Sequence, residues 1–399
     1  MSARTHRPRT ACRRPGLLVI AAGVGTTAAL VNRLHLHRDI AAEVHPDLQV
    51  VRLIVPPALA LGKPLACTAL TALMARAKTR ITGRPPAMPA QRTWDPALDL
   101  QALTIDSPVS AASPDSAASP DSAASAHSAR AVRVVVATSA AARDAFAAGR
   151  SVPALLWVHG GGHVLGDADA DVEVFRLLAN ELGAVAVAVD YRTAFTAPHP
   201  ADVDDCWTAL TWLRNGGLGA VDPRRIAVVG ESAGGGTAAS LVQRAVDHGV
   251  DLAAQVLIYP MLDDRAATRA RHGWAPRTRG RLLWSRSLDR LGWAAYLRGP
   301  GGTGPGSARP YAVPGRRTDL SGMPPTWIGV GDLDLFHDDD VAYASRLRES
   351  GVACELVVVP GMYHAADRVA PQVPVMQTWR ASMIAHLRRY LEPVGRDRT

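Results

Sequence analysis

Short apolar runs alternate with helix-compatible stretches along the second half of the chain. Each apolar run predicts a buried strand, and the predicted strands are Ala154–Val158, Ala184–Val189, Ile226–Val229, Gln255–Tyr259, Pro325–Val330 and Glu355–Val359. The helices predicted among and after them are Asp171–Leu182, Asp202–Arg214, Thr237–His248, Asp339–Ser350 and Gln377–Tyr390. This order predicts an α/β fold, with a mostly parallel central sheet covered by helices on both faces.

Two further strands are predicted ahead of this alternation, at Leu98–Asp106 and Ala131–Thr138. Between them, Ser107–Ala129 repeats the sequence Ser-Pro-Asp-Ser-Ala-Ala. A segment with so few apolar side chains cannot offset the entropy lost on ordering. We therefore expect a disordered loop that joins two paired strands.

The first part of the chain has a different pattern. Residues 1–15 are basic and Gly16–Val31 is apolar, which is the outline of a signal peptide or an anchor. The apolar run is shorter than the roughly 20 residues that span a bilayer, so a cytoplasmic protein is expected and membrane association through residues 16–31 is the alternative. Val50–Arg80 has apolar residues at helical spacing and predicts one or two amphipathic helices, either core or lid.

These patterns divide the 399 residues into two parts. Residues 1–95 are expected to form an N-terminal basic and apolar segment with a helical cap, and residues 96–395 a catalytic domain with its loop at 107–130. The net charge of +8 is dispersed along the chain, unlike the concentrated basic surface of a nucleic-acid-binding protein. The four cysteines are far apart and predict neither a disulfide framework nor a metal site.

The candidate nucleophile lies where the predicted strand at Ile226–Val229 turns into a helix. Gly230-Glu231-Ser232-Ala233-Gly234 matches the Gly-x-Ser-x-Gly nucleophile elbow, in which flanking glycines let the backbone make a sharp, strained turn. The motif alone is weak, because a glycine-rich turn of this kind is more often structural or phosphate-binding. The Lys of a Walker loop and the spacing of a dinucleotide-binding loop are both missing, so Ser232 needs partners elsewhere in the chain.

A glycine-rich turn supplies the first partner. His159-Gly160-Gly161-Gly162-His163 directly follows a predicted strand, and successive glycines let backbone N–H groups point toward a developing negative charge. We predict an oxyanion hole made by the N–H groups of Gly161, Gly162 and Ala233. His159 is expected to fix the loop.

An acid and a histidine follow two later strands. Asp334 and His364 complete the order Ser, Asp, His along the chain, which is the order of the α/β-hydrolase triad. Asp332 and Asp338 remain alternatives for the acid. The acidic run Asp338–Asp340 is expected to be a solvated helix start with a capping role, since no suitable ligands accompany it for a metal.

One long segment interrupts the alternation. Arg265–Pro314 combines several tryptophans with many arginines and a Gly/Pro-rich loop. It is either an excursion over the carboxyl edge of the sheet, where open α/β sheets bind ligands, or a surface insertion. Substrate choice is expected to depend on this segment and on Val50–Arg80.

With these motifs, the chain resembles the hormone-sensitive-lipase-like esterases, the bacterial family IV branch of the α/β-hydrolase superfamily. The motifs that carry the resemblance are His159–Gly162, Asp190–Arg192, Ala197–Ala201 with Asp204 and Asp205, Gly230–Gly235, Tyr259–Asp264, Asp334 and His364. The resemblance implies the α/β-hydrolase fold with an N-terminal helical cap, and a cofactor-free hydrolase of short-chain carboxylic esters. The chain departs from the family pattern at Glu231, at Asp334-Leu335 where Asp-Pro is usual, and at Ala365-Ala366 where Gly-Phe is usual.

The expected function is therefore that of a serine carboxylesterase acting on a small ester of the acetyl type, with no metal or cofactor and no nucleic-acid partner. An amide or formamide hydrolase would use the same residues. A non-catalytic ligand-binding relative is the alternative from another class, although such relatives typically lose the serine or the histidine. A membrane-tethered hydrolase acting on an envelope lipid rests on the N-terminal segment alone. The sequence does not define the oligomeric state.

Overall fold

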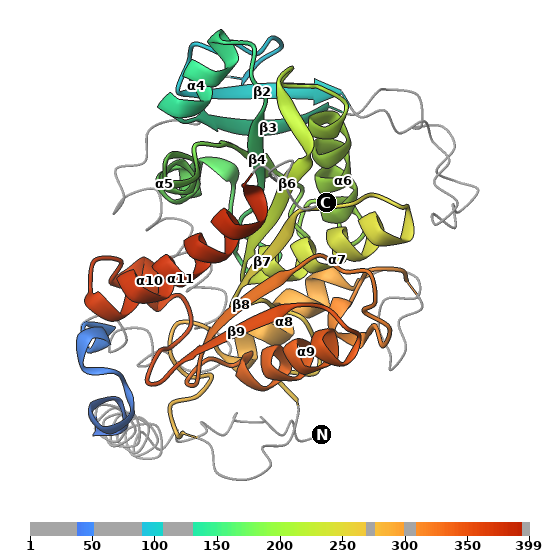
Figure 1. The fold of residues 1–399 in the computed structure, drawn as a ribbon. Coiled ribbons are helices and arrows are strands. Elements are labelled where there is room, and N and C mark those ends of the chain that lie inside the picture. Colours follow the sequence, from blue (N-terminus) through green and yellow to red (C-terminus); the bar gives the residue numbers. More distant parts are fainter. Residues whose placement is uncertain (1–37, 52–89, 107–130, 269–275, 299–308, 393–399) are drawn as a thin grey trace, which may run out of the picture.

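A mixed sheet lies at the centre of the computed structural model, which describes residues 38–51, 90–106, 131–268, 276–298 and 309–392 (Figure 1). Within these residues the sheet has nine strands in the order β1-β2-β3-β5-β4-β6-β7-β8-β9. The strands are β1 (Ala90–Gln91), β2 (Leu100–Asp106), β3 (Ala131–Thr138), β4 (Val152–Val158), β5 (Val185–Asp190), β6 (Val221–Glu231), β7 (Ala254–Ile258), β8 (Thr326–Gly331) and β9 (Cys354–Val359).

The strand directions confirm the predicted sheet. All neighbours from β5 to β9 are parallel, and β3 is antiparallel to both β2 and β5. Strands β2 and β3 pair with Leu100 opposite Ala137, so the two predicted strands on either side of the Ser-Pro-Asp repeat are partners. Every residue of β4 is buried, which explains its continuous apolar sequence: a central parallel strand is covered on both faces.

Helices cover both faces of the sheet, as predicted (Figure 1). The helices are α4 (Ala140–Ala147), α5 (Val172–Leu182), α6 (Ala201–Arg214), α7 (Ala233–Asp247), α8 (Arg286–Tyr296), α9 (His337–Glu349), α10 (Ala366–Val369) and α11 (Pro374–Leu391), with short 3₁₀ turns η1 (Pro46–Leu48), η3 (Ala168–Asp171) and η4 (Pro314–Arg316). One hydrophobic core contains Phe175 of α5 and Trp379 of α11, a second contains Leu210 of α6 and Tyr343 of α9, and a third contains Trp293 of α8.

Helix α7 begins at Ala233, four residues earlier than predicted. Gly234, Gly235 and Gly236 made this turn a poor helix by propensity. Tertiary contacts explain the glycines, because a Cβ at Gly234 would lie 2.2 Å from the carbonyl oxygen of His159. The glycines therefore let the nucleophile helix pack directly against the end of β4.

The acidic run Asp338–Asp340 lies at a helix start, as predicted, but the predicted cap and the predicted exposure of the whole run are wrong. Helix α9 begins at His337 after Phe336, so these aspartates occupy its first turn and provide no cap. Asp339 and Asp340 are buried, and burial raises the pKa of Asp340 well above its usual value. The helix starts early because the carboxylate of Asp334 accepts the backbone N–H of Phe336, at 3.0 Å.

Several predicted segments lie outside the described residues: residues 1–15 and 16–31, nearly all of Val50–Arg80, and the repeat at Ser107–Ala129. The described N-terminal piece, residues 38–51, buries Ile40 and Leu48 in the core. The N–H of His45 donates to the carbonyl of Gly361, at 2.9 Å. None of the helices within the described ranges has both the length and the apolarity to cross a membrane.

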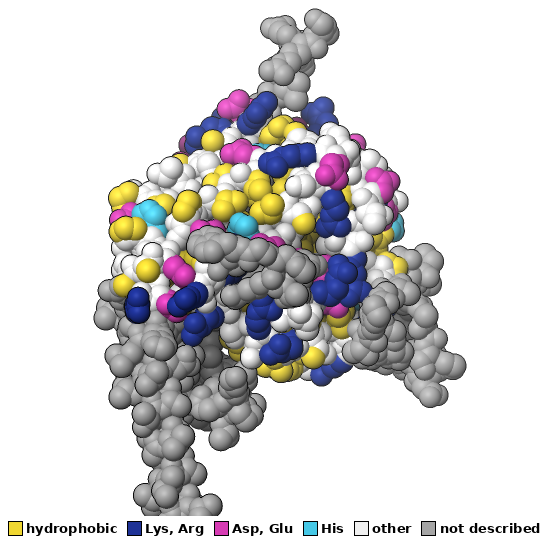
Figure 2. All heavy atoms as spheres, turned by 90° about the horizontal axis from the view of Figure 1, so that it is seen from below, with side chains coloured by type: hydrophobic (Ala, Val, Ile, Leu, Met, Phe, Trp, Pro, Cys, Tyr) yellow, Lys and Arg dark blue, Asp and Glu magenta, His cyan; other side chains and the backbone are white. Residues whose placement is uncertain are grey.

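Charged side chains are interspersed on the face shown in Figure 2, where arginines lie among acidic and hydrophobic residues. Many arginines form ion pairs. Arg317 makes two bonds with Asp247, at 2.7 and 2.8 Å, and Arg279 lies 2.8 Å from Asp338. Such surface pairs neutralise part of the basic charge and contribute at most about 1 kcal/mol each to stability.

Candidate active site

Four loops meet at the carboxyl edge of the parallel strands. The glycine-rich turn follows β4, Ser232 follows β6, Asp334 follows β8 and His364 follows β9. The carboxyl ends of parallel strands lie at one edge of a sheet, so residues more than 130 positions apart become neighbours. The order of the strands in the sheet therefore brings the site residues together.

Ser232 has the backbone of a nucleophile elbow. Its φ of 56° and ψ of −120° are strained for a residue with a side chain. Hydrogen bonds hold this conformation: its N–H donates to the carbonyl of Ile258 and its carbonyl accepts from Met261, both at 2.8 Å. The side chain lies at the N-terminus of α7, where the helix dipole favours negative charge.

A chain of hydrogen bonds joins the three predicted triad residues. Ser232 Oγ lies 3.0 Å from His364 Nε2, and His364 Nδ1 lies 2.7 Å from Asp334 Oδ2. Burial by itself would lower the pKa of His364, but the charge and hydrogen bond of Asp334 raise it above its usual value. The imidazole is therefore oriented with Nε2 free to take a proton from the serine.

The alternative acids have other contacts. Asp332 accepts the backbone N–H of Gly361, at 2.7 Å. Asp338 is exposed and contacts Arg279 and His337. Of the three candidates, Asp334 is the one that contacts His364.

The glycine-rich turn lies beside Ser232, since a Cβ at Gly160 would lie 3.5 Å from the Cβ of Ser232. Gly161 and Gly162 have φ of 129° and 62°, a region that glycine adopts readily. The carbonyl of Gly161 accepts from Val164 and Leu165, at 3.2 and 3.0 Å, which closes the turn. The N–H groups of Gly161, Gly162 and Ala233 donate to no other residue in the described ranges, so all three remain available to a ligand.

His159 fixes this turn, as expected. Its ring stacks on Tyr191 with centroids 4.1 Å apart, and its Nδ1 lies 2.9 Å from the carbonyl oxygen of Gly160. The hydroxyl of Tyr191 donates to the carbonyl of His159, at 2.7 Å. Burial lowers the pKa of His159, which keeps the ring neutral in this role.

Within Arg265–Pro314, the described residues 276–298 pack on the glycine-rich turn, which favours the predicted excursion over the carboxyl edge. A Cβ at Gly162 would lie 2.2 Å from the ring of Trp284. A Cβ at Gly292 of α8 would lie 2.6 Å from the carbonyl oxygen of Gly162. The Trp284 ring is also near His364, with 6.1 Å between centroids. The sequence did not predict α8, whose packing against the turn depends on tertiary contacts.

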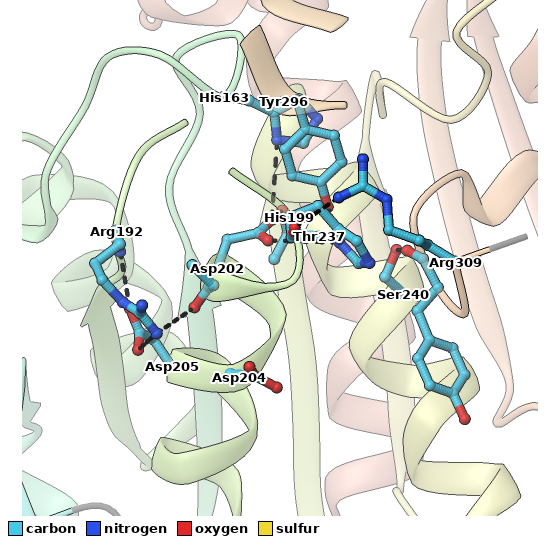
Figure 3. A network of polar contacts seen from close by, with 12 residues as sticks. His163, Arg192, His199, Asp202, Asp204, Asp205, Thr237, Ser240, Tyr296 and Arg309 are labelled. Carbon is cyan, nitrogen blue, oxygen red and sulfur yellow. Dashed lines mark hydrogen bonds and ion pairs between the residues drawn. The ribbon is translucent and has the colours of Figure 1, made fainter. Parts of the chain in front are cut away.

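A buried polar network lies behind the turn (Figure 3). Tyr296 of α8 stacks on His163 with centroids 3.8 Å apart, and its hydroxyl lies 3.0 Å from His199 Nδ1. Burial lowers the pKa of His199 to about 4, so the ring is neutral. Its Nε2 donates to the carbonyl of Pro310, at 2.9 Å, which leaves Nδ1 to accept the hydrogen bond from Tyr296.

The same network reaches the nucleophile helix. Asp202 of α6 accepts a hydrogen bond from Thr237 of α7, at 2.6 Å (Figure 3). Burial raises the pKa of Asp202 to about 6. Within the described part of the chain, no three His, Cys, Asp or Glu side chains lie together in a group that could hold a metal ion.

Fold and site together define an α/β hydrolase, and comparison with known proteins gives the same class. Residues 155–368 match the family model described as the alpha/beta hydrolase fold, which is more than half of the chain. The chain therefore belongs to this family, in the branch of hormone-sensitive-lipase-like esterases, which are carboxylic ester hydrolases.

Individual relatives support this branch. Carboxylesterase NlhH of Mycobacterium tuberculosis is 36% identical over 246 residues, which cover 60% of this chain and 75% of the relative. An ethyl acetate hydrolase of Pseudomonas putida is 32% identical over 245 residues, covering 60% and 73%. Among solved structures, a bacterial heroin esterase aligns with a TM-score of 0.65 and 28% identity, over 88% of this chain and 99% of that one.

Proposed function

We propose that this protein is a serine carboxylesterase that hydrolyses short-chain acyl esters through an acyl-enzyme. The observation that carries the proposal is the hydrogen-bond chain from Ser232 Oγ to His364 Nε2 and from His364 Nδ1 to Asp334, at 3.0 and 2.7 Å. A serine becomes a nucleophile when a positioned base takes its proton, and a third group holds that base in the right tautomer.

In the first half-reaction, His364 Nε2 takes the proton of Ser232 as Oγ attacks the ester carbonyl. The carbonyl π electrons move to oxygen, and the N–H groups of Gly161, Gly162 and Ala233 hold this oxyanion. When the tetrahedral intermediate collapses, the bond to the alcohol oxygen breaks and His364 gives its proton to the leaving alkoxide.

In the second half-reaction, water replaces the alcohol. His364 takes a proton from water, and the oxygen attacks the acyl carbonyl with the same three N–H groups holding the oxyanion. Collapse breaks the bond to Ser232 Oγ and returns the proton to it, so the free acid leaves. Asp334 remains ionised throughout and stabilises the imidazolium in both halves.

Two observations favour a small acyl group. The ring of Trp284 lies against Gly162 and faces His364, so an aromatic wall stands beside the reacting atoms. The ethyl acetate hydrolase is among the relatives, and its name describes an acetyl ester as substrate. We therefore expect acetate and propionate esters to be the best substrates.

The test is hydrolysis of p-nitrophenyl esters from acetate to laurate by the wild type, by Ser232→Ala and by Ser240→Ala. Ser240 is a matched control: it is a buried serine of α7 whose hydroxyl donates to the carbonyl of Tyr311, at 2.7 Å. We expect turnover that falls with chain length, is lost in Ser232→Ala and survives in Ser240→Ala. Turnover that survives Ser232→Ala would remove the serine mechanism, and activity on anilides with none on esters would indicate an amidase.

We also propose the two-part organisation: an N-terminal segment with a helical cap over residues 1–95, and a catalytic domain over residues 96–395. The support is the contact of residues 38–51 with the histidine loop and with the segment before α8. There Glu43 accepts hydrogen bonds from the N–H groups of Arg277 and Thr278, both at 2.7 Å. Fractionation of the full chain against a chain lacking residues 1–38 tests whether the N-terminus binds membranes; equal distribution of the two would argue against an anchor.

A further inference from the structure

A part-buried ion pair joins the residue before Ser232 to the loop that carries His364. Glu231 ends β6, and Arg368 lies in α10, four positions after His364. Glu231 Oε2 accepts from Arg368 Nε at 2.8 Å and lies 2.7 Å from Nη2. The ion pair and the Ser232–His364 hydrogen bond therefore join the same two loops, which follow β6 and β9.

The guanidinium is also tied to the core. Arg368 Nη2 lies 2.6 Å from Asp171 of η3, and Asp171 accepts a hydrogen bond from the indole of Trp157 of β4, at 3.0 Å. Trp157 is 1% exposed and belongs to the core of the sheet. The nitrogen that contacts Glu231 therefore also contacts an acid that is hydrogen-bonded to the core of the sheet.

The carboxylate of Glu231 lies against the oxyanion turn as well. A Cβ at Gly160 would be 3.4 Å from Glu231 Oε1 and 3.2 Å from its backbone oxygen. The same side chain therefore touches the elbow, the glycine-rich turn and the histidine loop, which are three of the four loops of the site.

A second tie acts on the neighbouring residue of α10. The hydroxyl of Tyr259, at the end of β7, donates to Asp367, at 2.7 Å, and its ring packs edge-on against His364 with centroids 4.8 Å apart. Helix α10 has only four residues and follows Ala365, whose φ is +56°. So short a helix has little rigidity of its own, and its ties to the ends of β6 and β7 hold the loop in place.

The ion pair is an inefficient way to stabilise a fold. Burial raises the pKa of Glu231 to about 7, against the opposing effect of Arg368, and Asp171 and Asp367 raise it further. Desolvating such charges largely cancels their attraction, so apolar residues in their place would often be equally stable. The ion pair of Glu231 and Arg368 instead fixes the distance and orientation between the nucleophile elbow and the histidine loop.

We propose that Arg368, acting through Glu231, is a positioning residue that keeps His364 Nε2 within hydrogen-bond distance of Ser232 Oγ. The inference rests on the proposed esterase function. At 3.0 Å the Ser232–His364 bond is within the ordinary range, and a displacement of about 1 Å would break it. Misplacement on this scale costs catalysis about 100-fold.

The experiment compares Arg368→Met, Arg368→Lys and Glu231→Gln with Arg317→Met as the matched control. Arg317 makes a bidentate pair with Asp247 near the far end of α7, and its side chain is 25% exposed against 26% for Arg368. The readouts are kcat and KM on p-nitrophenyl acetate, the Tm, and the low-field NMR resonance of the His364 Nδ1 proton, assigned by its absence in His364→Ala.

We expect Arg368→Met to lower kcat about 100-fold with KM changed less than about threefold, because substrate contacts are untouched. Arg368→Lys keeps the charge without the planar fork, so part of the activity returns. The His364 resonance shifts or broadens in Arg368→Met and stays in place in Arg317→Met. Glu231→Gln keeps the size of the side chain and removes its charge, so it tests the ion pair if Arg368→Met does not fold. For this variant we expect about a tenfold loss of kcat.

Two results would overturn the inference: folded variants at Arg368 and Glu231 with wild-type kcat and an unmoved resonance, or an equal loss in Arg317→Met. Failure of the proposed function gives a different pattern. If wild-type turnover is absent or survives Ser232→Ala, the esterase proposal fails, while the resonance still reports whether Arg368 positions His364.

Discussion

Two histidines on opposite sides of Ser232 have opposite environments. His364 lies on a flank held by charges, with Asp334 on its ring and the pair of Glu231 and Arg368 behind its loop. His163 lies on the flank of the glycine-rich turn, where Tyr296 stacks on it and neither ring nitrogen has a hydrogen-bond partner in the described residues. Asp334 raises the pKa of His364, whereas burial lowers that of His163 to about 3.

The two histidines differ in environment because the histidine loop and the glycine-rich turn have different tasks. A base must accept a proton at neutral pH, so a carboxylate has to stabilise its charged form. The glycine-rich turn only has to hold N–H groups still, and close apolar packing does this without charge. On that flank Trp284 and Gly292 enclose Gly162 from two sides. One flank is therefore sensitive to charge, and the other to volume.

The largest effect is expected at the charged flank, from His364→Ala. Without the base, kcat should fall on the order of 10⁶-fold, as for triad histidines in general. The Tm should also fall, since the substitution leaves the buried carboxylate of Asp334 without the imidazole it contacts. Steady-state kinetics with calorimetry measure both, and a loss of less than tenfold would mean that another group takes the proton.

Asp334→Asn is expected to have the next largest effect. It removes the charge that orients and stabilises the imidazolium, so kcat should fall about 10⁴-fold. The pH profile gives an independent check. In the wild type the activity should fall at acid pH with a midpoint above 6.5, because Asp334 raises the pKa of His364. In the variant this midpoint should move to lower pH. An unchanged midpoint would mean that the loss of activity at acid pH reports the titration of another group, such as Glu231.

Gly292→Ala tests the other flank by volume alone. The new Cβ would lie 2.6 Å from the carbonyl oxygen of Gly162, so the oxyanion turn must shift, and kcat should fall by about 10- to 100-fold. The substitution also raises helix propensity, which separates activity from stability.

The exposed residue Ala294 on the same helix provides the control for that prediction. Ala294→Gly should lower stability by up to about 1 kcal/mol with kcat unchanged, because it weakens α8 without touching the turn. Equal kcat in both variants, measured beside urea unfolding, would show that α8 does not hold the turn.

The smallest effect is expected from His163→Phe. The ring retains its stack on Tyr296, and two buried nitrogens without hydrogen bonds are removed, so kcat should stay within about twofold and the Tm should rise. The contact of Nδ1 with Asp202, at 3.9 Å, contributes little, because the low pKa of His163 keeps its ring neutral. The matching change His364→Phe should abolish turnover. A large loss of kcat in His163→Phe would mean that the imidazole has a role in the reaction.

Much of the fold is predictable because local patterns carry it. The apolar runs of β4 to β9 agree with the observed strands to within a few residues at most ends. For the central strands the reason is that a strand buried on both faces must be apolar throughout, whereas the edge strand β9 is only partly buried. The start of α7 was missed, because three glycines lower helix propensity while close contact with β4 requires them. Helix α8 was missed, since glycine at 292 and many polar residues obscure its helical pattern.

The triad residues could be predicted from the sequence, whereas the residues that hold them in place could not. Ser232, Asp334 and His364 follow strands in a fixed order along the chain, so their meeting at one sheet edge could be predicted. The partners that hold them could not. Glu231 and Arg368 are 137 positions apart, and neither has a local signal that names the other.

The sequence by itself determined the parallel sheet, the residues at its carboxyl edge and the chemistry they can perform. This is because strand periodicity and the glycine motifs are local properties of the chain. Only the tertiary structure decided which acid contacts His364, which glycines face Trp284 and which charges pair behind the site. Those choices depend on distances between loops, and the packing of helices against both faces of the sheet sets these distances.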